Sequence, residues 1–93
     1  MSPEEELARA NRAEQILGDS LFKEACNEIE QAILNGIKAS SIKDTDLREK
    51  LCQQYILFQA LLGQFRTHME TGKLAEATLR QRAIDAARKV VNW

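Results

Sequence analysis

The strongest apolar pattern in the chain lies between residues 45 and 72. Large apolar side chains recur there at steps of three and four residues, which places them on one face of a helix. They are Leu47, Leu51, Tyr55, Phe58, Leu62, Phe65 and Met69. Between residues 55 and 62 the apolar side chains spread to nearly every side of the same helix. Such a helix needs cover on several faces, so the rest of the chain or other copies must cover it.

Two shorter helices are predicted ahead of this stretch. The first spans residues 1–18: Ser2 caps it, Pro3 takes the first helical position, and Glu5 completes a capping box. Gly18 can end this helix and Asp19 can cap the next one, or the glycine can kink a continuous helix, so the interruption is either a break or a kink. The second helix spans residues 20–39. Its apolar positions share one face and include Phe22, Cys26, Ile29, Ala32, Ile33 and Ile37.

A short polar linker, residues 39–43, joins the second helix to the long one. Asp44, Thr45 and Asp46 are three candidate caps, and Asp46 with Glu49 resembles a capping box. Because so short a linker reverses the chain, residues 20–72 are expected to form an antiparallel hairpin of long helices.

Gly72 suits the end of the long helix, either as a left-handed cap or as a kink. A C-terminal helix with a weak apolar face follows over residues 73–93, with ion pairs expected for Glu76 with Arg80 and Asp85 with Lys89. The fold class predicted for residues 1–93 is therefore all-α and one domain. It consists of a hairpin of long helices with shorter N- and C-terminal helices.

The length of the hairpin points to self-association. The long helix spans about 40 Å, whereas a compact chain of 93 residues is about 32 Å across. A second helix covers only one side of the apolar centre, so other copies are expected to cover the remainder. The hairpin seam is assigned to Leu47, Leu51, Phe58 and Phe65. The oligomer interface is assigned to Tyr55, Ile56, Leu57 and Leu61.

Charge is unevenly distributed although the net formal charge is only −1. Up to Asp19, five acidic residues stand against two arginines, whereas the chain from Lys73 onward has more basic than acidic residues. The basic residues there are candidate contacts to DNA or to an acidic partner: Lys73, Arg80, Arg82, Arg88 and Lys89. These five residues do not lie on one narrow stripe of the helix. The alternative to a binding role is that they belong to an ordinary solvent-exposed helix face. Trp93 is a candidate anchor for a partner or simply a chain end.

No residue pattern indicates catalysis or a metal. His68 is the only histidine, and the sequence lacks a glycine-rich phosphate loop, a nucleophile elbow and a zinc motif. Cys26 and Cys52 fall in apolar stripes without a CxxC pair, which predicts buried, reduced thiols in a cytosolic protein. No apolar run approaches the roughly 20 residues that span a bilayer. We therefore expect no enzyme, no cofactor and no membrane partner.

Four short segments together suggest a family. They are Ala13-x-x-Ile16-Leu17, Leu21-Phe22-x-Glu24-Ala25, Asp46-x-Arg48-Glu49-Lys50-Leu51 and Glu70-Thr71-Gly72-Lys73-Leu74-Ala75. On these segments, across most of residues 10–79, the chain resembles small helical proteins of tailed bacteriophages, prophages and gene-transfer particles. More loosely it resembles the oligomerisation core of small terminase subunits. No clear helix-turn-helix precedes the hairpin, so no DNA-binding residue is carried over from those proteins.

The resemblance implies a setting in virion assembly or genome packaging. Small terminase subunits form rings, bind packaging-site DNA and regulate a separate large subunit with ATPase and nuclease activities. Our first hypothesis is such a packaging protein, located in the bacterial host cytoplasm or on the virion, with DNA and the large terminase subunit or another phage protein as partners. The alternative hypothesis is a protein-only adaptor or regulator that binds its partner through the exposed apolar face of the long helix.

Overall fold

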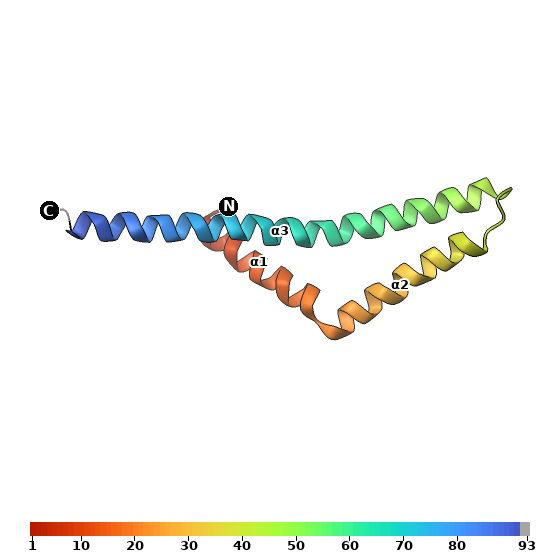
Figure 1. The fold of residues 1–93 in the computed structure, drawn as a ribbon, viewed down its shortest axis with the longest axis horizontal. Coiled ribbons are helices and arrows are strands. Elements are labelled where there is room, and N and C mark those ends of the chain that lie inside the picture. The colour runs from red at the N-terminus through yellow and green to blue at the C-terminus, as the bar shows by residue number, and fades with distance from the viewer. Residues whose placement is uncertain (92–93) are drawn as a thin grey trace. The chain divides into compact units, whose positions relative to one another are not determined.

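The computed structural model describes the backbone of residues 1–91 and the side chains of residues 1–89 (Figure 1). It contains three helices: α1 (Pro3–Gly18), α2 (Ser20–Ala39) and α3 (Thr45–Val91). No strand occurs within residues 1–91, which confirms the all-α prediction. Trp93 lies outside the described residues.

The starts of α1 and α2 are capped as the sequence predicts. The Ser2 hydroxyl accepts a hydrogen bond from the Glu5 amide at 3.2 Å and donates one to the Glu5 carboxylate, also at 3.2 Å. Asp19 has an extended backbone between α1 and α2, and its carboxylate accepts a hydrogen bond from the Phe22 amide at 2.9 Å. The Ser2 and Asp19 bonds each satisfy a backbone amide that lacks a partner in its own helix. Because Asp19 is extended and caps a new helix, the interruption after Gly18 is a break between two helices.

Asp44 is the cap of α3, so the predicted capping box at Asp46 is wrong. The Asp44 carboxylate accepts a hydrogen bond from the Leu47 amide at 3.2 Å, and Thr45 already lies in the helix. Across the loop, the Arg48 guanidinium donates to the Ser40 hydroxyl at 3.4 Å. That hydroxyl donates in turn to the Ile37 carbonyl at 2.6 Å. Side chains at both ends of the loop thus stabilise the chain connection.

The predicted end of the long helix at Gly72 is also wrong. α3 continues without a break from Thr45 to Val91, so residues 73–91 belong to it and do not form a separate C-terminal helix. No glycine has a positive φ, which a left-handed cap requires. A single glycine costs a helix only about 1 kcal/mol, and the helical residues on both sides outweigh that cost.

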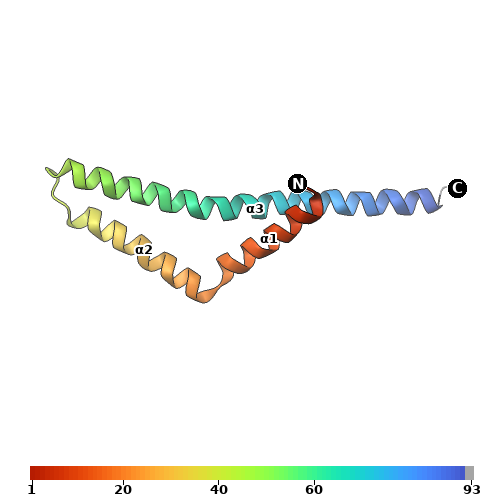
Figure 2. The same ribbon diagram turned by 180° about the vertical axis from the view of Figure 1, so that it is seen from behind.

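The chain forms two compact units, and α3 contributes to both. The terminal unit combines Met1–Gln15 with the chain from Phe65 onward, and the central unit is Ile16–Gln64. In the central unit, α2 lies nearest to the first part of α3 beside the connecting loop and diverges from it toward Ser20 (Figure 2). Ile33 and Leu62 are buried there. Gly36 lies so close to Leu51 that a Cβ on it would be 3.3 Å from a Leu51 methyl group.

The two thiols lie in different environments. Neither forms a disulfide; Cys26 is half-buried, whereas Cys52 is exposed. The prediction of two buried thiols is therefore wrong for Cys52. The sequence pattern placed Cys52 among apolar neighbours, but exposed side chains surround it in α3, including Gln53 and Ile56.

Candidate interaction surfaces

The central unit contains an apolar groove between α2 and α3. It has a volume of about 550 Å³, and its walls and floor are formed by Ile29, Ala32 and Ile33 from α2 and Gln54, Leu57, Phe58 and Leu61 from α3. None of these side chains is charged, and Gln54 is the one polar member. An uncharged, shallow apolar surface of this kind is typical of the centre of a protein interface.

Of the four residues predicted to form the oligomer interface, two line this groove and two do not. Leu57 and Leu61 line the groove, with 72% and 55% of their surfaces exposed. Ile56 is 67% exposed but is not part of the groove lining, because each residue turns a helix by about 100° from the one before it. Tyr55 is half-buried.

The α2 side of the groove was not predicted as an interaction surface. The sequence pattern places Ile29 and Ala32 on the apolar face of the second helix, yet Ile29 is 49% exposed. Ala32 is the one small side chain in the groove lining, and its size is the one sequence signal for this opening. The two helices also diverge toward Ser20 (Figure 2), and no local sequence pattern predicts that divergence.

The terminal unit is held by a close contact between α1 and α3. A methyl group built on Gly72 would overlap the Cβ of Ala10, and it would lie 3.7 Å from the Glu6 carbonyl oxygen. Ala10, Ala13, Gly72 and Ala75 are all buried. The glycine in α3 thus serves close helix approach, which a larger side chain at this position would prevent. Paired small residues three apart in both helices were the overlooked signal.

A small pocket of about 210 Å³ lies beside this contact. α1 contributes Leu7, Ala10, Asn11 and Glu14 to its lining, and α3 contributes Met69, Gly72, Lys73 and Glu76. The lining contains one ammonium group and two carboxylates. Lys73, a predicted contact to DNA or an acidic partner, thus shares this pocket with two acidic side chains.

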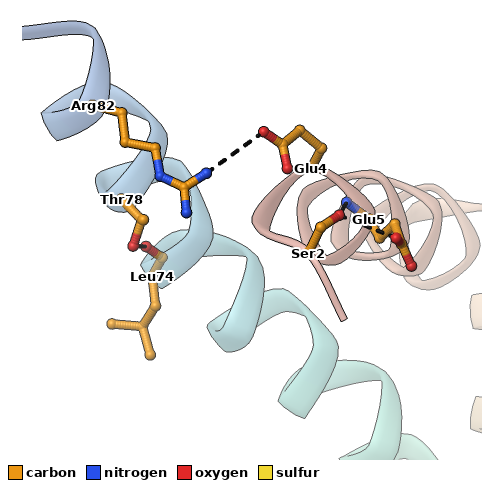
Figure 3. Close-up of polar contacts among 6 residues, drawn as sticks. All are labelled: Ser2, Glu4, Glu5, Leu74, Thr78 and Arg82. Atoms are coloured by element: carbon orange, nitrogen blue, oxygen red, sulfur yellow. Dashed lines mark hydrogen bonds and ion pairs between the residues drawn. The ribbon is translucent and has the colours of Figure 1, made fainter. Parts of the chain in front are cut away.

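Among the described residues, two of the predicted basic contact residues form ion pairs within the chain. Arg80 Nη2 lies 3.2 Å from Glu76 Oε1 within α3, which confirms that predicted pair. Arg82 Nη1 lies 3.9 Å from Glu4 Oε1, which joins α3 to the first turn of α1 (Figure 3). These side chains are more than half exposed, so each pair contributes at most about 1 kcal/mol.

The end of α3 is open to solvent. Every described side chain from Arg80 to Lys89 is exposed, including Arg88 and Lys89. Asp85 accepts a hydrogen bond from the Gln81 amide nitrogen at 3.0 Å, where the sequence predicted an ion pair with Lys89. The five predicted basic residues therefore lie on one helix, at its exposed end and beside α1.

The described residues do not form a metal-binding cluster or a membrane-spanning helix. Within residues 1–91, no group of three His, Cys, Asp or Glu side chains is placed to hold a metal ion. Over the same range, none of the helices is both long enough and apolar enough to cross a bilayer.

In comparisons with known proteins, no protein family, no curated protein and no solved structure matches this chain.

Proposed function

We propose that this chain is a non-enzymatic assembly protein that binds a second copy of itself through the apolar groove of the central unit. The groove is the observation that carries the proposal. Leu57 and Leu61 expose most of their surface beside a hollow in which Ile33 and Phe58 lie. In a two-fold dimer, these leucines of each copy enter the groove of the other, because one self-complementary patch serves both partners.

The size of the face supports a second copy as the occupant. α2 has 20 residues and is about 30 Å long. Two helices 8–10 Å apart present a face about 20 Å wide. Because α2 diverges from α3 toward Ser20 (Figure 2), the flat projection of this face is on the order of 600 Å² at most, which is of the same order as the roughly 800 Å² per partner of a stable complex. A single peptide helix would bury a narrower strip and leave part of the groove walls in water.

Two helices from each copy would form a four-helix bundle. The α2 helix and the first part of α3 would then act as the antiparallel hairpin that the sequence predicts, and its apolar side would become the core of the bundle. This arrangement supplies the cover that the apolar centre of α3 requires.

Genome packaging in a tailed phage or a related particle is the setting we propose for this assembly. The resemblance to small terminase subunits and the exposed basic end of α3 support it. Five basic residues, from Lys73 to Lys89, extend over about 24 Å of helix. A dimer would present two such stretches, and linked sites increase the apparent affinity for DNA.

The alternative is an assembly protein whose partners are proteins only. The carboxylates near Arg80 and Arg82 favour it, since basic side chains with acidic neighbours in their own chain attract phosphate less strongly. The two functions differ in one observable. A packaging protein is retained on DNA with an affinity that falls steeply with salt, whereas the adaptor is not retained on DNA at any salt concentration.

Thermal unfolding at several protein concentrations tests the proposed dimer. When folding and association are coupled, a tenfold increase in protein concentration should raise Tm by about 3–6 °C. Circular dichroism at 222 nm from about 2 to 200 µM measures the change. A Tm that is the same across this range would contradict association through the groove.

A further inference from the structure

The first turn of α1 carries charge opposite to that of the α3 segment beside it. Glu4, Glu5 and Glu6 form this acidic turn, and Glu4 Oε1 lies 3.9 Å from Arg82 Nη1 (Figure 3). Farther along α1, Glu14 lines the same pocket as Lys73. α1 thus brings carboxylates close to two of the five basic residues of α3.

α1 is held by little apolar surface. Its buried side chains are Ala10 and Ala13, the smallest that can carry a Cβ. A helix that buries so little area gains little from docking. Local opening of such an element requires much less free energy than global unfolding. The helix also ends at Gly18, and the non-helical Asp19 separates it from α2.

We propose that α1 is an acidic cover that competes with nucleic acid for the basic stretch of α3. The inference rests on the proposed DNA-binding role and adds its regulation. With α1 docked, the carboxylates of Glu4 and Glu14 weaken the field around Arg82 and Lys73. When α1 leaves, these side chains join the exposed Arg88 and Lys89, and the potential becomes more positive around Lys73 and Arg82, whereas Arg80 keeps its Glu76 partner.

Duplex DNA is the partner that this chemistry fits. Three of the five basic residues are arginines, whose planar guanidinium group binds phosphate oxygens with two parallel hydrogen bonds. DNA also presents phosphates at about 3.4 Å along each strand, so a segment of about 24 Å faces several of them. DNA phosphates would compete with the α1 carboxylates for the same guanidinium groups.

The experiment measures binding of the full chain to a fluorescent duplex of about 25 base pairs by anisotropy across a salt series. The test variant carries Glu4→Gln, Glu5→Gln and Glu6→Gln. Glutamine keeps the side-chain oxygen that accepts from Ser2. The matched control carries Glu24→Gln, Glu28→Gln and Glu49→Gln, three exposed residues of the central unit. Both variants have the same net charge.

The acidic-turn variant is expected to bind DNA about tenfold more tightly than the control. The logarithm of its binding constant should also fall more steeply with the logarithm of the salt concentration. The increase in slope should correspond to about one to two additional phosphate contacts. Equal affinities and slopes for the two variants would overturn the inference, because net charge alone would then explain the effect. Equal displacement of DNA by polyglutamate of the same total charge would overturn the assignment to nucleic acid.

A second variant changes no charge. Gly72→Leu places a side chain where Ala10 now lies and should displace α1, so it should also tighten DNA binding. If wild type binds DNA and neither Gly72→Leu nor the acidic-turn variant binds more tightly, the proposal that α1 competes with DNA is wrong, whereas the proposed DNA-binding role stands. If wild type and both variants all fail to bind DNA, the proposed DNA-binding role falls as well.

Discussion

Replacing Gly72 with alanine is expected to loosen α1 by about 1–2 kcal/mol, even though the same change usually stabilises a helix. The new methyl group would overlap the Cβ of Ala10, and an alanine Cβ has no torsion through which it can move aside. Overpacking of this kind costs about 1–3 kcal/mol, which exceeds the gain of roughly 1 kcal/mol in helix propensity. Native-state hydrogen exchange should show about tenfold less protection of the α1 amides.

Gly63→Ala is the matched control for Gly72→Ala. It lies in the same helix, and a Cβ built on it meets no atom within 4 Å. It should therefore stabilise α3 by up to about 1 kcal/mol. The two substitutions thus have opposite signs, which helix propensity alone would not give.

The contact also predicts a rescue. In the double variant with Ala10→Gly and Gly72→Ala, the methyl group moves from α1 to α3, and the overlap disappears. A double-mutant cycle should give a favourable coupling of at least about 1 kcal/mol between the two positions. Additive effects would show that the helices do not meet at this pair.

Replacing Leu57 and Leu61 with glutamine should abolish self-association. Full burial of a leucine contributes about 1.5–3 kcal/mol, and a two-fold interface contains each position twice. Loss at one position therefore costs at least about 3 kcal/mol of association free energy, which is more than a hundredfold in Kd. Sedimentation equilibrium of the double variant should give the mass of a monomer over the concentration range in which wild type is dimeric.

Ile56→Gln provides the control for this experiment. Ile56 is as exposed as its neighbour Leu57 but does not line the groove. The change removes similar apolar surface from the same helix and should weaken association by less than threefold. If Ile56→Gln dissociates the oligomer as completely as the double variant does, the interface lies on a different face of α3.

The sequence predicted the local features of the fold well. Ser2, Asp19 and Pro3 act through hydrogen bonds or backbone angles within one turn, so their residue types alone indicated where α1 and α2 begin. Asp44 was among three adjacent candidates, and choosing between them required the backbone geometry of the helix start. The i,i+4 pair of Glu76 with Arg80 was predictable for the same local reason.

The features that depend on a second helix were missed. A glycine such as Gly72 can end a helix or can allow a second helix to approach closely, and the sequence alone does not distinguish these two roles. Only the position of Ala10 in the structure does so. The proximity of Glu4 to Arg82 joins residues from the two ends of the chain, which no local pattern reveals. The apolar excess around Leu57 was visible in the sequence, whereas the groove that Ile29 and Ala32 form beside it was not.

The molar mass of the wild-type chain in solution tests self-association most directly. Multi-angle light scattering across a concentration series should give at least twice the chain mass of 10.5 kDa, and the Leu57/Leu61 double variant should give 10.5 kDa under the same conditions. A wild-type mass of 10.5 kDa at every concentration up to about 200 µM would contradict the proposal that a second copy occupies the groove.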